Sequence, residues 1–186
     1  MYVYREIYHT KRTVKTHAKQ INELSKGEGY EFSVADHDAE DRATLRENGI
    51  TTIAARKDVN PGIEGVQERL KDAGDGRARL YVFRNCLVER DPALSESKKP
   101  CSILEEFDSY TWPKAPDGKP HKEAPEKLND HAMDALRYAA MAIDRGIAAF
   151  EPDHVREERE RQEAEDAYRS HMDINNPIWW SEGGRW

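Results

Sequence analysis

Segments with the two-residue period of a strand alternate along this chain with segments that have the helical period of about 3.6 residues. The opening MYVYREIY alternates as a strand, and the apolar residues of 13–26 fall on one helical stripe. Further strands are expected at 30–36, 50–55 and 78–83, and further helices at 38–48 and 60–74. This order predicts an α/β fold in which helices flank a mixed sheet. Which strands are neighbours in that sheet does not follow from the pattern.

Local signals place the ends of the expected helices. Gly27 and Gly49 stand where helices end, and Asp38 can cap the helix that follows it. Asn60 followed by Pro61 has the character of a cap and a first-turn proline. The remaining elements are a short helix or strand in 102–112, a proline-rich loop in 113–127 and a core helix from Asn129 or Asp130 to about Arg145.

The length and charge of the chain indicate one domain followed by a tail. The 186 residues suffice for a single hydrophobic core, which we expect in 1–149. Residues 151–186 hold ten acidic and five basic side chains, so most of the net charge of −7 lies in a charged tail, 150–186. A body this close to neutral neither requires nor excludes a nucleic-acid partner, because phosphate binding depends on local clusters of Lys and Arg.

Cysteine content and hydropathy bear on the location of the protein. Cys86 and Cys101 have no metal-ligand companions at short spacing, so they are expected to be reduced thiols. No apolar run approaches the length that spans a bilayer, and charges interrupt the apolar residues of the N-terminus. These features predict a soluble intracellular protein without a membrane partner.

Two acids and a histidine begin the last core helix, in LNDHAMDALRYAAMAI. Asp134 lies four residues after Asp130 and three after His131, so these side chains share a helical face. Capping and surface exposure explain any one of them alone. Asp134, however, borders the apolar run that follows it, where an acid needs a positive partner. A divalent cation such as Mg²⁺ or Mn²⁺ suits oxygen ligands with an imidazole.

A second acidic cluster, VADHDAEDR, follows an expected strand. Asp36 and Asp38 lie just past the carboxyl end of that strand, which is where open α/β sheets place their ligands. Either residue can instead cap the next helix, and the residues alone leave both interpretations open. The two clusters together indicate a metal site more strongly than each does separately.

The segments EEFDSYTW, PEKLNDHAMDALRYAAM and SVADHDAEDRATLRENGITTIAARKDVNPGIEGVQERL resemble the C-terminal nuclease domain of tailed-phage terminase large subunits. The resemblance covers roughly residues 1–149 and implies a ribonuclease H-like fold. It also implies a metal-dependent endonuclease that cuts concatemeric DNA with two Mg²⁺ or Mn²⁺ ions. The matching ligands are Asp36, with Asp38 as a near alternative, and His131 and Asp134, with Asp130 adjacent.

The chain also departs from that family. The family's first catalytic aspartate lies on a strand upstream of MYVYREIY, so the resemblance implies an N-terminally truncated domain that lacks this acid. Glu6 is a strand acid, but its position matches a structural one. The pattern G-x-x-x-x-G-K-[ST] of the ATPase motor is not present either. We therefore expect a fragment, a truncated reading frame or one piece of a split gene.

The resemblance implies double-stranded DNA, the phage portal and the small terminase subunit as partners, in the cytoplasm of the infected bacterial host. Contacts to DNA are expected mostly at phosphates. Lys57, Lys122 and Lys127 are the candidates for these contacts, although a solvated lysine at a strand end explains Lys57 equally well. Other basic candidates are Lys11, Arg12, Lys15, Lys19, Lys114 and Lys119.

An alternative function is a non-catalytic packaging scaffold that docks on the portal or the motor. The tail HMDINNPIWWSEGGRW carries Trp179, Trp180 and Trp186, and tryptophans of this kind anchor protein interfaces. Packing of the same residues back onto the body is an equally simple explanation. The sequence leaves this alternative open.

Overall fold

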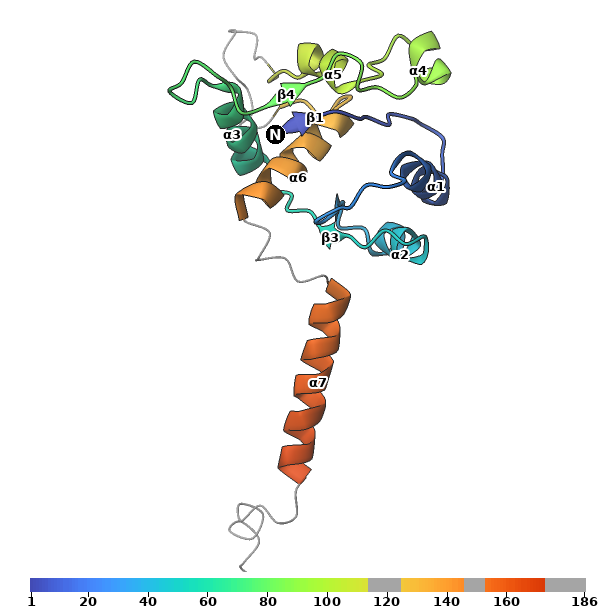
Figure 1. The fold of residues 1–186 in the computed structure, drawn as a ribbon, viewed down its shortest axis with the longest axis vertical. Helices are drawn as coiled ribbons and strands as arrows, with labels where there is room; N and C mark the ends of the chain where they lie inside the picture. The colour runs from blue at the N-terminus through green and yellow to red at the C-terminus, as the bar shows by residue number, and fades with distance from the viewer. Residues whose placement is uncertain (114–124, 146–152, 173–186) are drawn as a thin grey trace, which may run out of the picture. The chain divides into compact units, whose positions relative to one another are not determined.

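A computed structural model describes residues 1–113, 125–145 and 153–172. The chain divides into two compact units, Met1–Ala149 and Phe150–Trp186. The elements of the first unit, in chain order, are β1 (Tyr2–Val3), α1 (Val14–Leu24), β2 (Val34–Ala35), α2 (Ala39–Glu47), β3 (Ile53–Ala54), α3 (Val59–Leu70), β4 (Tyr81–Val82), α4 (Pro92–Glu96), α5 (Ile103–Ser109) and α6 (His131–Arg145) (Figure 1). The second unit contains α7 (Asp153–Met172).

The described strands form two separate parallel pairs. β1 pairs with β4 in the register Tyr2 to Tyr81, and β2 pairs with β3 in the register Val34 to Ile53. An isolated parallel bridge between Glu6 and Leu87 continues the first pair. The α/β class is therefore confirmed. The single mixed sheet that we expected is not formed by the described residues, because no strand among them joins β1 to β2.

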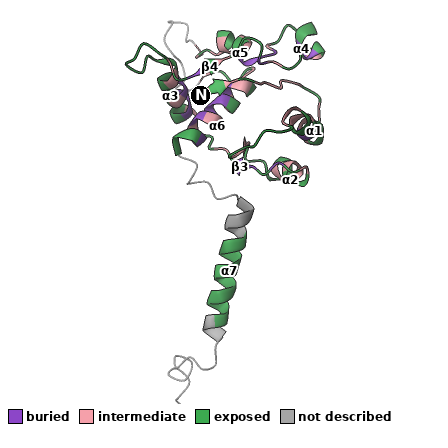
Figure 2. Cartoon of the chain, viewed as in Figure 1, coloured by how far each residue is buried: buried purple, intermediate pink, exposed green. Residues whose placement is uncertain are grey.

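Helix α6 is the centre of the first unit. It packs along α3 and also contacts α5 and β2. The core cluster that it joins consists of Val66, Leu80, Ile103, Met133, Leu136 and Ala140 (Figure 2). The two helices approach closely at Gly62, where an added Cβ would lie 3.0 Å from the Cβ of Arg137. The apolar run after Asp134 is thus a core face, as its sequence predicted.

Most of the predicted helix starts are correct. Thr13 caps α1 by accepting a hydrogen bond from the backbone of Thr16, and Asp38 caps α2. The start predicted at Asn60 is wrong, because α3 already begins at Val59 after Asp58. A proline is tolerated throughout the first turn, so it does not fix the exact start. Helix α4 was not predicted, although Asp91 caps it from the preceding position.

The structure also bears on the predictions for the cysteines, for membrane-spanning helices and for the charged tail. Cys86 and Cys101 are buried free thiols, as predicted. None of the helices in the described ranges is long and apolar enough to cross a membrane. The charged tail contains helix α7, which is exposed along 158–169 (Figure 2). Trp179, Trp180 and Trp186 lie outside the described residues.

Candidate metal and nucleic-acid site

Asp36, His131 and Asp134 line one cavity of about 460 Å³. Asp36 follows directly after β2, and the other two side chains project from the first turns of α6. β2 contacts α6, which explains why residues almost a hundred positions apart meet here. Tyr138 also lines the cavity, one turn further along the helix than Asp134. One acid from each of the two clusters, together with His131, thus lines a common cavity.

The Asp36 carboxylate is held by two neighbours. Its Oδ1 atom lies 2.7 Å from the Nδ1 atom of His37 and 2.7 Å from the Nζ atom of Lys57. The hydrogen bond from His37, followed by the one from Lys57, lowers the pKa of Asp36 to about 2. The same contact with Asp36 raises the pKa of Lys57. The cavity therefore presents an ionised carboxylate next to a charged lysine at neutral pH.

The Asp134 carboxylate pairs with the buried guanidinium of Arg137 on the same helix. It also acts on Tyr138, whose pKa is raised first by burial and then by the charges of Asp134 and Asp36. Both carboxylates therefore lie near one phenol. Because the pKa is raised, the hydroxyl of Tyr138 stays protonated at neutral pH and remains a hydrogen-bond donor.

Glu106 fixes the first turn of α6, where His131 and Asp134 are located. This side chain is fully buried, and its Oε2 atom accepts hydrogen bonds from the backbone N–H groups of Ala132 at 2.8 Å and Met133 at 3.0 Å. Its Oε1 atom accepts a hydrogen bond from the hydroxyl of Tyr8. Burial raises the pKa of Glu106. A carboxylate from α5 thus satisfies helix N–H groups that have no partner within the helix.

Glu6 caps the start of helix α5 in the way that Glu106 caps the start of α6. Its Oε1 atom accepts a hydrogen bond of 2.7 Å from the backbone N–H of Ile103, the first residue of α5. Burial raises its pKa as well. The sequence assigned Glu6 a structural position but gave no role to Glu106. The only available signal was an acid inside the apolar segment ILEEF, and a tertiary cap of this kind has no local spacing that would reveal it.

The other predicted ligands lie elsewhere. Asp38 accepts hydrogen bonds of 3.0 Å from the backbone N–H groups of Glu40 and Asp41, so its carboxylate caps α2. The backbone oxygen of Asp130 accepts the first hydrogen bond of α6, from Asp134, at 2.8 Å. Neither Asp38 nor Asp130 lines the cavity that holds Asp36.

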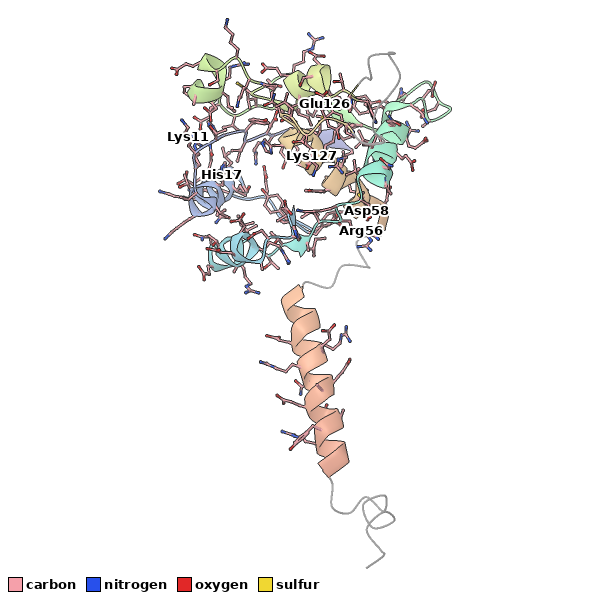
Figure 3. The ribbon with its side chains drawn as sticks, turned by 180° about the vertical axis from the view of Figure 1, so that it is seen from behind. Lys11, His17, Arg56, Asp58, Glu126 and Lys127 are labelled. Atoms are coloured by element: carbon pink, nitrogen blue, oxygen red, sulfur yellow. The ribbon has the colours of Figure 1, made fainter. Side chains whose placement is uncertain are left out.

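The lysines predicted to contact DNA lie in different parts of the chain, and some of them are outside the described residues. Lys57 pairs with Asp36, which lines the cavity, but Lys57 itself does not line it. Lys127 is exposed on the segment that leads into α6 (Figure 3). Lys122, together with Lys114 and Lys119, lies outside the described residues. Lys15 and Lys19 line a groove of about 560 Å³ along α1, which also contains Lys26, a residue that was not among the candidates.

The donor types around the cavity fit a divalent cation. Two carboxylates and an imidazole are ligands that Mn²⁺ accepts and that Mg²⁺ uses together with water. Within 1–113, 125–145 and 153–172, no three His, Cys, Asp or Glu side chains are gathered closely enough to hold a metal. Both carboxylates instead pair with cationic side chains, Lys57 and Arg137. A bound cation would compete with these partners.

No protein-family model matches the chain, and no curated protein or solved structure is significantly similar to it.

Proposed function

We propose that this chain is a metal-dependent DNA endonuclease with a ribonuclease H-like fold, of the kind found in tailed-phage terminases. The observation that supports it best is the shared cavity of Asp36, His131 and Asp134. These residues come from two distant segments, and each matches a ligand position that the terminase resemblance implies. Helix capping alone accounts for Asp38, but it gives no reason for Asp36 and Asp134 to line the same cavity.

Two bound Mg²⁺ or Mn²⁺ ions would supply the Lewis acidity and the activated water for phosphodiester hydrolysis. The carboxylates of Asp36 and Asp134 and the imidazole of His131 would hold the ions. Lys57, released from Asp36, would contact a phosphate of the bound strand. Tyr138 would donate a hydrogen bond into the cavity, because its hydroxyl stays protonated.

Double-stranded DNA is the proposed substrate, and its phosphates rather than its bases are the proposed contacts. Lys57 pairs with Asp36, Lys127 is on the segment before α6, and Lys15, Lys19 and Lys26 border the groove along α1. Packaging in the cytoplasm of an infected bacterium, with the portal and the small terminase subunit as partners, follows from the same proposal. Binding that depends on phosphates weakens steeply as salt is raised.

Nicking of supercoiled plasmid in the presence of Mn²⁺ tests the proposal. The purified full chain is compared with the variants Asp134→Asn and Asp130→Asn. Asp130 is the matched control because it is an aspartate on the same turn that does not line the cavity. We expect Asp134→Asn to lower the rate of nicking at least about a hundredfold, as removal of a group that stabilises the transition state does. Asp130→Asn should retain the rate.

Two outcomes would count against the endonuclease. Equal nicking by the wild type and Asp134→Asn would mean that the activity comes from another site or from a contaminant. No metal-dependent nicking by any of the three proteins would leave the chain with the cavity but without the reaction. The scaffold function would then be the better account of the chain.

A further inference from the structure

The two faces of the β1–β4 pair carry different kinds of side chain. Because side chains alternate along a strand, Val3 and Val82 turn toward the core cluster and pack against it. Tyr2, Tyr81 and Phe83 turn the opposite way, and they are 65%, 41% and 49% exposed. The inner face of this pair, which the chain covers itself, thus carries valines, whereas the exposed outer face carries aromatic rings.

Tyr2 stacks against two aromatic rings of β4. Tyr2 and Tyr81 are directly opposite in the strand register, and their ring centroids are 5.3 Å apart with an angle of 15° between the planes. The centroids of Tyr2 and Phe83 are 6.3 Å apart, with an angle of 27°. Both arrangements are offset stacks. Within the described residues the ring contacts of Tyr2 come only from β4, so the stack is open on the side of Tyr2 that faces away from β4.

The next tyrosine of the same segment is occupied by the chain itself. The guanidinium carbon of Arg5 lies 5.2 Å from the centroid of the Tyr4 ring, and the hydroxyl of Tyr4 donates a hydrogen bond of 3.1 Å to Glu28. Arg5 and Glu28 also form an ion pair with each other at 2.8 Å. In the described part of the chain no cationic group lies over the ring of Tyr2 in this way. The open aromatic face therefore belongs to Tyr2.

Positive charge accompanies the aromatic rings. Residues 76–88, which include β4, contain three exposed arginines and no acidic residue. They are Arg77, Arg79 and Arg84. Arg79 pairs with Asp75 at 2.8 Å and stays half exposed. The pKa of Arg79 is raised first by Asp75 and to a smaller extent by Tyr81 and Tyr2, so its guanidinium lies near both phenols.

The combination of open rings with arginines selects the kind of occupant. Hydrophobic contact with protein is non-directional, and the core of this chain makes it with the valines of the inner face, so such contact does not require rings. A nucleobase does use a ring, because its planar face stacks on an aromatic side chain, and the phosphates beside it pair with arginine. The bases of a duplex already stack on one another, so only an unpaired strand offers a free base.

We propose that an unpaired strand of nucleic acid binds the outer face of the β1–β4 pair, with one base stacked on Tyr2 and the neighbouring phosphates at the arginines of 76–88. The proposal does not depend on the endonuclease activity. Tyr2 does not line the cavity that holds Asp36 and Asp134, so the two sites can be tested separately.

Fluorescence anisotropy of a labelled oligothymidylate measures its binding to the full chain. An oligomer of about eight nucleotides is long enough for a site of this kind. The buffer contains EDTA, so neither metal binding nor cleavage contributes to the signal. The matched probe is a strand with the same number of phosphates whose sugars carry no bases. We expect the abasic strand to bind at least about fivefold more weakly, because it keeps the phosphate contacts and loses the base stacking.

Substitutions of Tyr2 separate base stacking from apolar contact. Tyr2→Leu keeps an apolar side chain but has no ring, so the affinity for oligothymidylate should fall at least about fivefold. Tyr2→Phe keeps the ring and should bind within about twofold of the wild type. Tyr168→Leu is the matched control, because Tyr168 on α7 is 64% exposed, close to the 65% of Tyr2, and it should leave the affinity unchanged.

Three results would overturn the proposal. The first is no binding of oligothymidylate, which is expected if the chain's own tail or a second copy covers the outer face. The second is equal binding of the abasic strand, and the third is equal binding by Tyr2→Leu. Asp134→Asn should bind oligothymidylate like the wild type, so a failure of the endonuclease proposal leaves this result unaffected.

Discussion

Replacing Glu106 with alanine removes the carboxylate that caps α6 from a neighbouring helix. Two backbone N–H groups, of Ala132 and Met133, then lose their acceptor. A buried donor left without a partner costs about 1–3 kcal/mol, so Glu106→Ala should lower the free energy of unfolding by about 3 kcal/mol. For a chain of this length each kcal/mol lowers the melting temperature by about 2–4 °C, which gives a loss of roughly 10 °C.

Glu106→Gln separates the loss of the hydrogen bonds from the loss of the charge. One oxygen of Glu106 accepts both helix N–H groups, and a glutamine oxygen in the same place can do so too. The amide nitrogen would then donate to the hydroxyl of Tyr8. We therefore expect Glu106→Gln to cost no more than about 1 kcal/mol.

Urea denaturation followed by circular dichroism measures these changes. Glu126→Ala is the matched control, because Glu126 is an exposed glutamate in the same unit (Figure 3). Amide exchange at Ala132 and Met133 should accelerate in Glu106→Ala and stay slow in Glu106→Gln. A loss of stability in Glu106→Ala no larger than that in Glu126→Ala would refute the role of Glu106 as the cap of α6.

Three further predictions follow from particular contacts. Burial raises the pKa of Glu106, so its contribution to stability is complete below the ordinary glutamate pKa of about 4.3 and is lost as pH rises through the higher folded pKa. The free energy of unfolding of the wild type relative to Glu106→Gln, measured in urea, should therefore fall over that pH range. A difference that stays constant with pH would contradict this prediction. Gly62→Ala should cost about 1–3 kcal/mol because its Cβ would meet the Cβ of Arg137 at 3.0 Å. Gly65→Ala, whose Cβ would lie 3.3 Å from a terminal oxygen of the Asp144 side chain, should cost less when both variants are melted thermally. Equal costs would argue against a tight α3–α6 contact at Gly62. Asp36→Asn should change the free energy of unfolding by less than about 1 kcal/mol, because the Asp36 side chain is 54% exposed and its ion pair with Lys57 is screened by solvent. A larger loss of stability in urea denaturation would mean that this ion pair holds β2 in place.

Local chemistry made part of the fold predictable. Asp38 caps α2 because an aspartate accepts from the next N–H groups, and Gly49 ends that helix with a positive φ of 83°. The apolar run after Asp134 identified α6, since its period and length leave few alternatives. In each case the signal and the structure lie within one helix.

Other features depend on residues that are distant in the sequence. Glu106 caps a helix 25 residues further along the chain, so its role becomes visible only when α5 and α6 are packed together. The sequence also gave no sign that the strands would divide into two pairs, because alternation predicts a strand and does not choose its neighbour. The meeting of Asp36 with Asp134 was implied by the terminase resemblance. It did not follow from the spacing of either cluster.

In the proposed function Asp36, His131 and Asp134 form one cation site, and Mn²⁺ binding measured by electron paramagnetic resonance of the free ion tests this claim. Asp36→Asn and Asp134→Asn should each weaken Mn²⁺ binding by about tenfold or more, because each removes a carboxylate from the cavity. Asp38→Asn and Asp130→Asn should leave the affinity within about twofold, since neither side chain lines it. Equal affinity in all four variants, or a loss confined to Asp38→Asn, would contradict the claim.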